Sequence, residues 1–280
     1  MRVQLCGVRG STSAPGAEFV RYGGHTSCVA VAHDQDVVPT LILDAGSGLR
    51  QVTPLLAGRA FSGTILLTHL HWDHVHGLPF FRAGDRDDAQ VTVLLPDQQH
   101  EASAEAVLER GMSPPHFPIR PRDLLGAWTF GTISPGRLAA EGFTVEAREI
   151  PHKGGRTFGY RISDGRSVLA YLPDHCPTSL GPGPSGWGEY HDAAVELAAG
   201  ADVLMHDAQL LEQEVAAEAA FGHAAGAYAV GLGVVAGARQ VLLFHHKPDR
   251  TDDELDKLGS RLSGGPVPVT VAAQGETLSL

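Results

Sequence analysis

Four side chains that bind metal ions well stand within six residues of one another: His69, His71, Asp73 and His74. They follow residues 64–67, which are β-branched and aliphatic and predict a buried strand that ends where the polar residues begin. Imidazoles and a carboxylate crowded this closely lose hydration and repel one another unless a cation holds them. The spacing therefore favours a metal site on a loop at the carboxyl edge of a strand over a solvated polar turn.

Three more residues of ligand type each follow another apolar run: His152, Asp174 and His245. The combined set of five imidazoles and two carboxylates exceeds what one tetrahedral zinc takes, but two metals that share a carboxylate and a hydroxide would use it fully. The sequence thus predicts a binuclear centre. Two Zn²⁺ ions suit this set, and Mn²⁺ or Fe²⁺ would also bind, because nitrogen and oxygen ligands discriminate poorly among them. The metals, carboxylates and hydroxide sum to a net charge of about +1, which favours an anionic substrate or a transition state that gains negative charge.

Asp44 stands at the exit of a further apolar run, residues 40–43. Its carboxylate could cap the helix expected near residues 49–56. It could equally accept a hydrogen bond that fixes the tautomer of a ligand imidazole. The sequence leaves both roles open.

The elements that must position these residues can be read from the apolar runs and the turn residues between them. Strands are predicted at residues 2–8, 28–32, 40–43, 64–67, 91–95, 128–133, 143–150, 158–163, 167–172, 201–205, 240–244, 267–272 and 277–280. Helices are predicted at residues 49–56, from 76 onward, and at 98–110, 192–199, 210–220, 224–235 and 249–262. Asp164-Gly165 predicts a hairpin between two of the strands.

Length and composition bound the remaining choices. The chain of 280 residues has no evident linker, so a single domain over residues 1–280 is expected. Its three cysteines lack CxxC spacing, which predicts buried thiols and neither a disulfide framework nor a thiolate zinc site. The apolar start before Arg9 is too short for a signal peptide and no membrane span follows, so a cytoplasmic protein is expected. A net charge of −11 without a basic stripe argues against a large nucleic-acid footprint.

Residues 69–74, His-Leu-His-Trp-Asp-His, resemble the HxHxDH signature of the metallo-β-lactamase superfamily. The likeness extends from Asp44 to His245 and implies an α/β fold, a four-layered αβ/βα sandwich with the metals between the inner sheet edges. The pattern also implies the ligand sets: His69, His71 and His152 for one metal, Asp73, His74 and His245 for the other, and Asp174 as a bridge.

Within that superfamily the chain most resembles the transfer-RNA 3′-processing endonucleases and related phosphodiesterases. The likeness rests on His152, Phe158-Gly-Tyr-Arg161, His206-Asp207-Ala-Gln209, which resembles their HEAT motif, His223 and His245. In that family the acid of the motif and the later histidine protonate the leaving oxygen, which implies the dyad of Asp207 and His223. Here the acid is Asp instead of Glu, and Ala-Ala instead of Ser-Thr follows His223, so a helix-capping role for His223 stays open.

The substrate is expected to be a small or cyclic phosphodiester. The segment from His152 to Asp174 is nearly all used by a hairpin, so it cannot hold the arm with which those nucleases grip RNA, and the acidic charge makes an extended nucleic acid a poor partner. Asp73 is expected to orient the attacking hydroxide, and a homodimer is compatible with this interpretation. The alternatives are a carboxyl-ester, lactone or thioester hydrolase, and a non-catalytic metal-bound sensor or partner-binding module.

Several residues near the predicted site have no role assigned from the sequence: His25, His116, His175 and His246. The proline-rich segment 112–121 is expected to be stiff and irregular. It would serve either as a substrate lid or as a connector.

Overall fold

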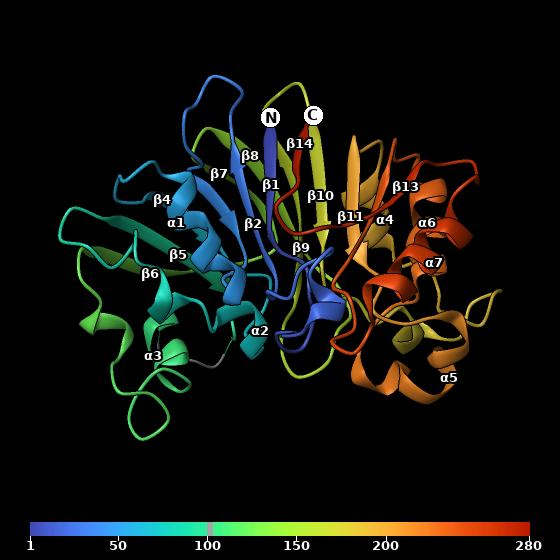
Figure 1. Cartoon of the computed structure of the whole chain (residues 1–280), viewed down its shortest axis with the longest axis horizontal. Helices are drawn as coiled ribbons and strands as arrows, with labels where there is room; N and C mark the ends of the chain where they lie inside the picture. Colours follow the sequence, from blue (N-terminus) through green and yellow to red (C-terminus); the bar gives the residue numbers. More distant parts are fainter. Residues whose placement is uncertain (100–102) are drawn as a thin grey trace.

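Two mixed sheets of seven strands each form the centre of the structure, a computed structural model that describes residues 1–99 and 103–280 (Figure 1). The strand order is β14-β1-β2-β3-β4-β5-β6 in the first sheet and β13-β12-β11-β10-β9-β8-β7 in the second. The strands are β1 (Arg2–Gly7), β2 (Cys28–Ala32), β3 (Leu41–Leu43), β4 (Ser62–Leu66), β5 (Gln90–Pro96), β6 (Ala127–Ile133), β7 (Gly136–Ala140), β8 (Phe143–Glu149), β9 (Phe158–Ser163), β10 (Val168–Leu172), β11 (Val203–Asp207), β12 (Val241–Phe244), β13 (Val269–Val271) and β14 (Thr277–Ser279).

Helices cover the outer face of each sheet, and short 3₁₀ turns connect them. The α-helices are α1 (Val52–Leu55), α2 (Trp72–Val75), α3 (Ala104–Glu109), α4 (Asp192–Ala198), α5 (Val215–Glu218), α6 (Gly226–Ala236) and α7 (Asp252–Leu262). The 3₁₀ helices are η1 (Ala17–Phe19), η2 (Ser47–Gln51), η3 (Leu78–Phe80), η4 (Pro121–Asp123), η5 (Pro177–Leu180), η6 (Glu212–Glu214) and η7 (Ala219–Phe221). No helix in residues 1–99 and 103–280 is both long and apolar enough to cross a membrane.

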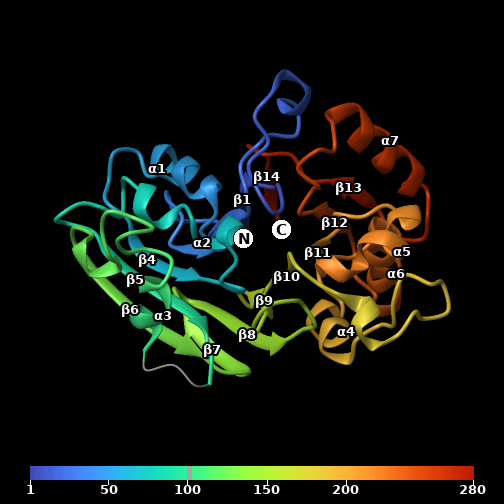
Figure 2. The ribbon, with the colours of Figure 1, turned by 90° about the horizontal axis from the view of Figure 1, so that it is seen from below.

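Three apolar clusters show how the layers stack. One joins the two sheets and contains, among others, Leu43 of β3 and Tyr171 of β10. A second packs α4, α6 and α7 onto the second sheet, and a third packs η2, α1 and α3 onto the first. Helix, sheet, sheet and helix therefore follow one another (Figure 2), and the predicted four-layered αβ/βα sandwich is confirmed.

The strands were predicted better than the helices. Strand β7 was missed because its sequence, Gly-Arg-Leu-Ala-Ala, carries little β-branched character. The helix expected from residue 76 is wrong: α2 begins at Trp72, and only the 3₁₀ turn η3 follows it. The segment 210–220 was expected to be one helix but is broken into η6, α5 and η7. Of the helix predicted at 98–110, residues 100–102 lie outside the described part, and α3 begins at Ala104.

Parallel pairing brings the expected site residues to one edge. Strand β3 pairs in parallel with β4, and β10 pairs in parallel with β11, which pairs in the same way with β12. The carboxyl ends of parallel strands lie at the same edge of a sheet, and the two sheets pack face to face. The residues that follow or end these strands are Asp44, His69, Asp174, Asp207 and His245, and they meet where the sheets adjoin.

Candidate metal centre and active site

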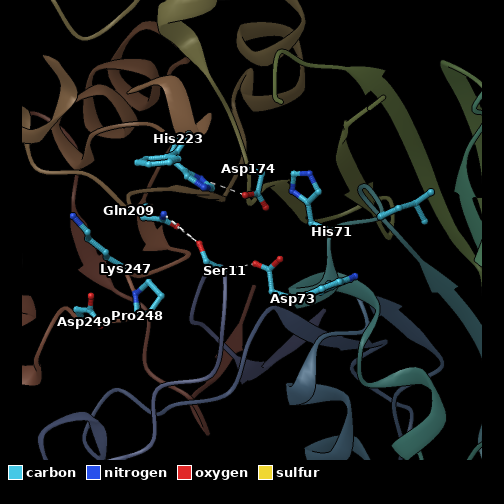
Figure 3. Close-up of a pocket in the computed structure, with 12 residues that line it drawn as sticks. Ser11, His71, Asp73, Asp174, Gln209, His223, Lys247, Pro248 and Asp249 are labelled. Carbon is cyan, nitrogen blue, oxygen red and sulfur yellow. Dashed lines mark hydrogen bonds and ion pairs between the residues drawn. The ribbon is translucent and has the colours of Figure 1, made fainter. Parts of the chain in front are cut away.

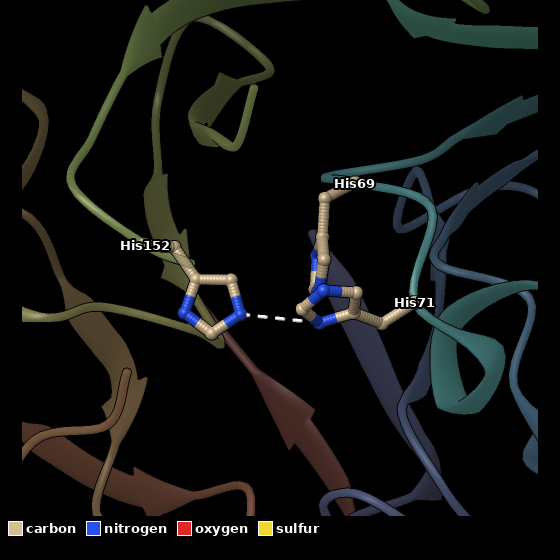
Figure 4. Close-up of side chains that lie close together, drawn as sticks. All are labelled: His69, His71 and His152. Carbon is tan, nitrogen blue, oxygen red and sulfur yellow. Dashed lines mark hydrogen bonds between the residues drawn. The ribbon is translucent and has the colours of Figure 1, made fainter. Parts of the chain in front are cut away.

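Three histidines form the first group of converging ligand atoms: His69, His71 and His152 (Figure 4). Nε2 of His152 lies 3.2 Å from Nδ1 of His71. The other ring nitrogen of His152, Nδ1, donates to the Gly222 carbonyl oxygen at 2.7 Å, which fixes the tautomer and turns the Nε2 lone pair toward the group. Nε2 of His69 is buried and has no hydrogen-bond partner among the described residues. Such an arrangement suits a metal ion.

A second group is formed by Asp73, His74 and His245. Nε2 of His74 lies 3.3 Å from Nε2 of His245. Oδ2 of Asp73 lies 3.3 Å from Nε2 of His74 and 3.1 Å from Nε2 of His245. Two imidazole nitrogens and a carboxylate oxygen thus point at one another inside the protein. All three residues are buried, so solvent does not satisfy them.

Asp174 lies between the two groups. Its Oδ2 is 3.8 Å from Nε2 of His69 and 2.8 Å from Nε2 of His74. Its Oδ1 is 3.8 Å from Nε2 of His152 and 3.3 Å from Nε2 of His245. One carboxylate therefore reaches both groups, as a bridging ligand must.

The charges around these groups call for a cation. Burial holds the pKa of His69 well below its usual range, so the ring is neutral and can act as a ligand. Burial acts in the same direction on His74, but Asp73, Asp174 and Asp44 around it raise its pKa well above the usual value. Three buried carboxylates around one imidazole carry more negative charge than that ring can neutralise. Burying this excess charge destabilises the fold unless a cation compensates it. The residues present therefore fit two divalent cations.

Asp44 takes the second of its two predicted roles. Its Oδ2 lies 2.8 Å from Nδ1 of His74, and it also accepts from the hydroxyl of Tyr171 at 2.9 Å. The backbone N–H of Thr68 donates to its Oδ1 at 2.7 Å. The residue at the N-cap of η2 is Gly46, with no side-chain cap, so the capping role is wrong.

Sequence reasoning missed the contribution of the loop after β1. The backbone N–H of Ser11 donates to Oδ2 of Asp73 at 2.6 Å. A Cβ on Gly10 would lie 2.4 Å from the ring of His245, so only glycine lets the loop approach that imidazole. The Gly/Ser/Pro composition of residues 10–16 marked a loop, but composition does not show which side chain a backbone amide will meet.

His223 and Asp207 form the expected pair. Nδ1 of His223 lies 3.0 Å from Oδ2 of Asp207 and 3.4 Å from Oδ1 of Asp174. Burial alone would lower the pKa of His223, but the neighbouring carboxylates raise it to about 9. The N-cap of α6 is Ala225, so the helix-capping role for His223 is wrong. A protonated imidazole held by a carboxylate beside these groups of ligand atoms can donate a proton.

A cleft of about 530 Å³ opens onto the ligand groups and the pair (Figure 3). Its lining includes Asp73, Asp174, Gln209 and His223. Among the described lining residues the one Lys or Arg side chain is Lys247, whose Nζ lies 2.7 Å from Glu218 and 3.4 Å from Glu214. Its charge is largely neutralised within the protein, so the described lining residues offer no unpaired Lys or Arg side chain to a ligand.

The four histidines without an assigned role lie around the site in different ways. Nδ1 of His175 pairs with Nε2 of His206 at 2.9 Å, and Nε2 of His246 donates to the Ala272 carbonyl oxygen at 2.8 Å. His25 lies 3.1 Å from the Ser47 hydroxyl. His116 lines a separate apolar pocket beside the cleft. The three cysteines are free and buried, as predicted.

Comparisons with known proteins show the family of the chain. A family model described as Beta-lactamase superfamily domain matches residues 40–246, which contain all seven expected ligands. The ribonuclease Z of Limosilactobacillus fermentum is 28% identical over 223 residues, which cover 65% of this chain and 68% of that protein.

Solved structures show the same fold at low identity. The metallo-beta-lactamase fold protein YhfI from Bacillus subtilis aligns over 99% of both chains with a TM-score of 0.73 and 18% identity. A diphosphatase from the PhnP family aligns over 100% of this chain and 97% of that chain, with a TM-score of 0.68 and 17% identity.

Proposed function

The chain belongs to the beta-lactamase superfamily and is a metal-dependent hydrolase, and we propose that its substrates are small or cyclic phosphodiesters. The observation that carries the proposal is the 3.0 Å contact between His223 and Asp207 at the edge of the ligand cluster. The leaving group of a thioester is a thiolate, which has little need of an added proton, whereas a phosphodiester with an alkoxide leaving group gains much from a positioned proton donor.

We assign His69, His71 and His152 to one metal ion, and Asp73, His74 and His245 to the other, with Asp174 shared. The absence of thiolate and the predominance of imidazole favour two Zn²⁺ ions, and the same donors would accept Mn²⁺ or Fe²⁺. Such a pair of cations would activate a water molecule for attack on phosphorus and offset the negative charge of the phosphoryl oxygens.

The side chains of the protein supply positioning and proton transfer. Asp73, fixed by the Ser11 amide, is placed to orient the attacking water. When the bond between phosphorus and the leaving oxygen breaks, His223 transfers its proton to that oxygen, and Asp207 stabilises the imidazolium beforehand. General acid catalysis of this kind contributes about 10²- to 10⁴-fold to the rate.

The surroundings of the site favour a small substrate over an RNA. Strands β9 and β10 pair as a hairpin, which uses most of the segment between His152 and Asp174. With a net charge of −11 and Lys247 paired internally, the chain offers little positive surface to a long polyanion. The relative named ribonuclease Z carries an RNA substrate in its name. This chain would share the chemistry of that protein and act on a smaller substrate.

A side-by-side assay tests the proposal. The zinc-loaded protein is expected to hydrolyse bis(p-nitrophenyl) phosphate and a cyclic nucleotide with kcat/KM values above those for a thioester, a lactone and a p-nitrophenyl carboxylate. Higher kcat/KM on the acyl substrates would assign the protein to acyl hydrolysis instead. Metal-loaded protein that turns over none of them would support a binding module.

A further inference from the structure

A pocket of about 270 Å³ lies next to the metal cleft and has a different character. Its walls include Leu108, Met112 and Phe117, together with Trp72 and Phe80. The rings of Phe80 and Phe117 meet edge to face at a centroid distance of 5.8 Å. None of the described residues that line this pocket is Asp, Glu, Lys or Arg. The pocket therefore suits an uncharged apolar or aromatic group.

The pocket adjoins the cleft at one side chain. Trp72 lines both the pocket and the cleft, and it directly follows His71, a proposed metal ligand. Its side chain is 71% exposed although it is one of the largest apolar groups in the chain, and Phe80 is 53% exposed. Exposed aromatic side chains beside a reactive centre offer a surface that a substrate can cover. The volume is slightly below the roughly 300–1,000 Å³ of pockets that take a whole small molecule, so the pocket fits one part of a substrate.

We propose that this pocket binds an aromatic ester substituent of the phosphodiester, and that it sets a preference for aryl or heteroaryl diesters. The inference rests on the proposed function. It follows from the contact of the pocket with the cleft at Trp72, from pocket walls that hold His76 and His116 but no described Asp, Glu, Lys or Arg, and from the internal pairing of Lys247, which disfavours a second phosphate.

The position of the pocket decides which substituent it takes. Trp72 begins α2 on the side of the first sheet, whereas His223 precedes α6 on the side of the second sheet (Figure 2). The leaving oxygen must face His223 to receive its proton. The substituent that stays on phosphorus is therefore the one directed toward Trp72 and the pocket. Water attacks phosphorus, the leaving group departs with one proton, and the aryl phosphate monoester is the product held by the pocket.

Two esters with the same leaving group test this assignment: p-nitrophenyl phenyl phosphate and p-nitrophenyl methyl phosphate. Nitrophenolate release is measured for both with the zinc-loaded protein, and the ratio of their kcat/KM values is compared between variants. Burial of one phenyl ring predicts a ratio of at least roughly tenfold in favour of the phenyl ester. Phe117→Ala and Phe80→Ala should each lower this ratio several-fold, mainly through KM of the phenyl ester.

Leu125→Ala is the matched control, because Leu125 is also an exposed apolar side chain, at 52%, and lines neither the pocket nor the cleft. It should keep the wild-type ratio. Equal ratios in wild type and in both Phe variants would overturn the inference while the proposed function stands.

A binding measurement separates failure of the pocket from failure of the proposed function. Phenylphosphonate should quench the part of the tryptophan fluorescence that is missing in Trp72→Phe, at a concentration at least tenfold below that needed for methylphosphonate, and Phe117→Ala should remove the difference. If neither ester is hydrolysed, the phosphodiesterase proposal fails, and this titration alone decides the pocket. Equal affinities for the two phosphonates would then overturn the pocket assignment as well.

Discussion

Oδ2 of Asp44 lies 2.8 Å from Nδ1 of His74, and the opposite nitrogen of that ring, Nε2, lies 2.8 Å from Oδ2 of Asp174. One imidazole thus connects a buried carboxylate behind the site with the proposed bridging carboxylate. Because Nδ1 donates to Asp44, Nε2 is the nitrogen left for a metal ion, which would replace the second proton of the ring. Asp44 is held in turn by Thr68 and Tyr171, so the ring orientation is fixed before any metal binds.

Asp44→Asn should weaken metal binding about 10- to 100-fold, because an amide is a weaker partner for the Nδ1 proton and can present its NH₂ group instead. Competition with a fluorescent zinc chelator measures the affinity. Asp87→Asn, at an exposed acid, is the control and should bind as wild type does. Unchanged affinity in Asp44→Asn would show that His74 does not depend on this contact.

Gly10→Ala should lower the affinity for the metal assigned to His245 and leave the fold intact. A Cβ at this position would lie 2.4 Å from the ring, so the loop or the imidazole must move. Gly265→Ala is the control, since its Cβ would meet no atom within 4 Å. Metal content is measured after dialysis against limiting zinc. Full loading of Gly10→Ala would show that the loop can shift without lowering the metal affinity.

His223→Ala should retain both metals and lose about 10²- to 10⁴-fold in kcat on a diester with an alkyl leaving group. Its activity on a p-nitrophenyl ester should fall far less, because nitrophenolate departs without a proton. The p-nitrophenyl ester serves as the control for the alkyl diester, and the metal content of the variant is measured alongside. Wild-type activity on the alkyl diester would remove His223 from the role of acid.

The grouping of ligand-type side chains after β4 could be predicted from the sequence because they are local: His69 to His74 follow one apolar strand, and their spacing favours a cation. The role of Asp44 could not, since a carboxylate at a strand exit meets its partner only when β3 and β4 pair. The contact between Ser11 and Asp73 depends on a backbone amide, which every residue but proline carries. The aromatic pocket escaped prediction for a similar reason, because Phe80 and Phe117 are far apart in sequence and meet only in the fold.

Glu214 offers a test of pH dependence away from the ligands. Partial burial would raise the pKa of its carboxyl, but hydrogen bonds from Arg250 at 2.6 Å and from the Leu211 amide at 2.7 Å hold it below the usual value. Because the pKa is lower in the folded protein, the ionised carboxylate of Glu214 stabilises the fold at pH values above the unfolded-state pKa of about 4.3. This stabilisation is lost as the pH falls through the lower, folded-state pKa.

Glu214→Gln should therefore lower the free energy of unfolding by about 1–3 kcal/mol at pH 7, and the difference from wild type should shrink on acidification below about pH 4. Urea unfolding at several pH values measures it. Glu18→Gln, at an exposed acid, should show no such trend. A difference that stays constant from pH 7 to pH 3.5 would mean that the charge of Glu214 does not contribute.

Two metal ions, held by seven ligands that include the shared Asp174, are proposed to hydrolyse a phosphodiester. Stripped protein titrated with Zn²⁺, with hydrolysis of bis(p-nitrophenyl) phosphate followed at each step, tests it most directly. Activity is expected to rise to a plateau at two equivalents of zinc per chain, and Asp174→Ala is expected to abolish it. A plateau at one equivalent, or full metal loading without phosphodiester hydrolysis, would contradict it.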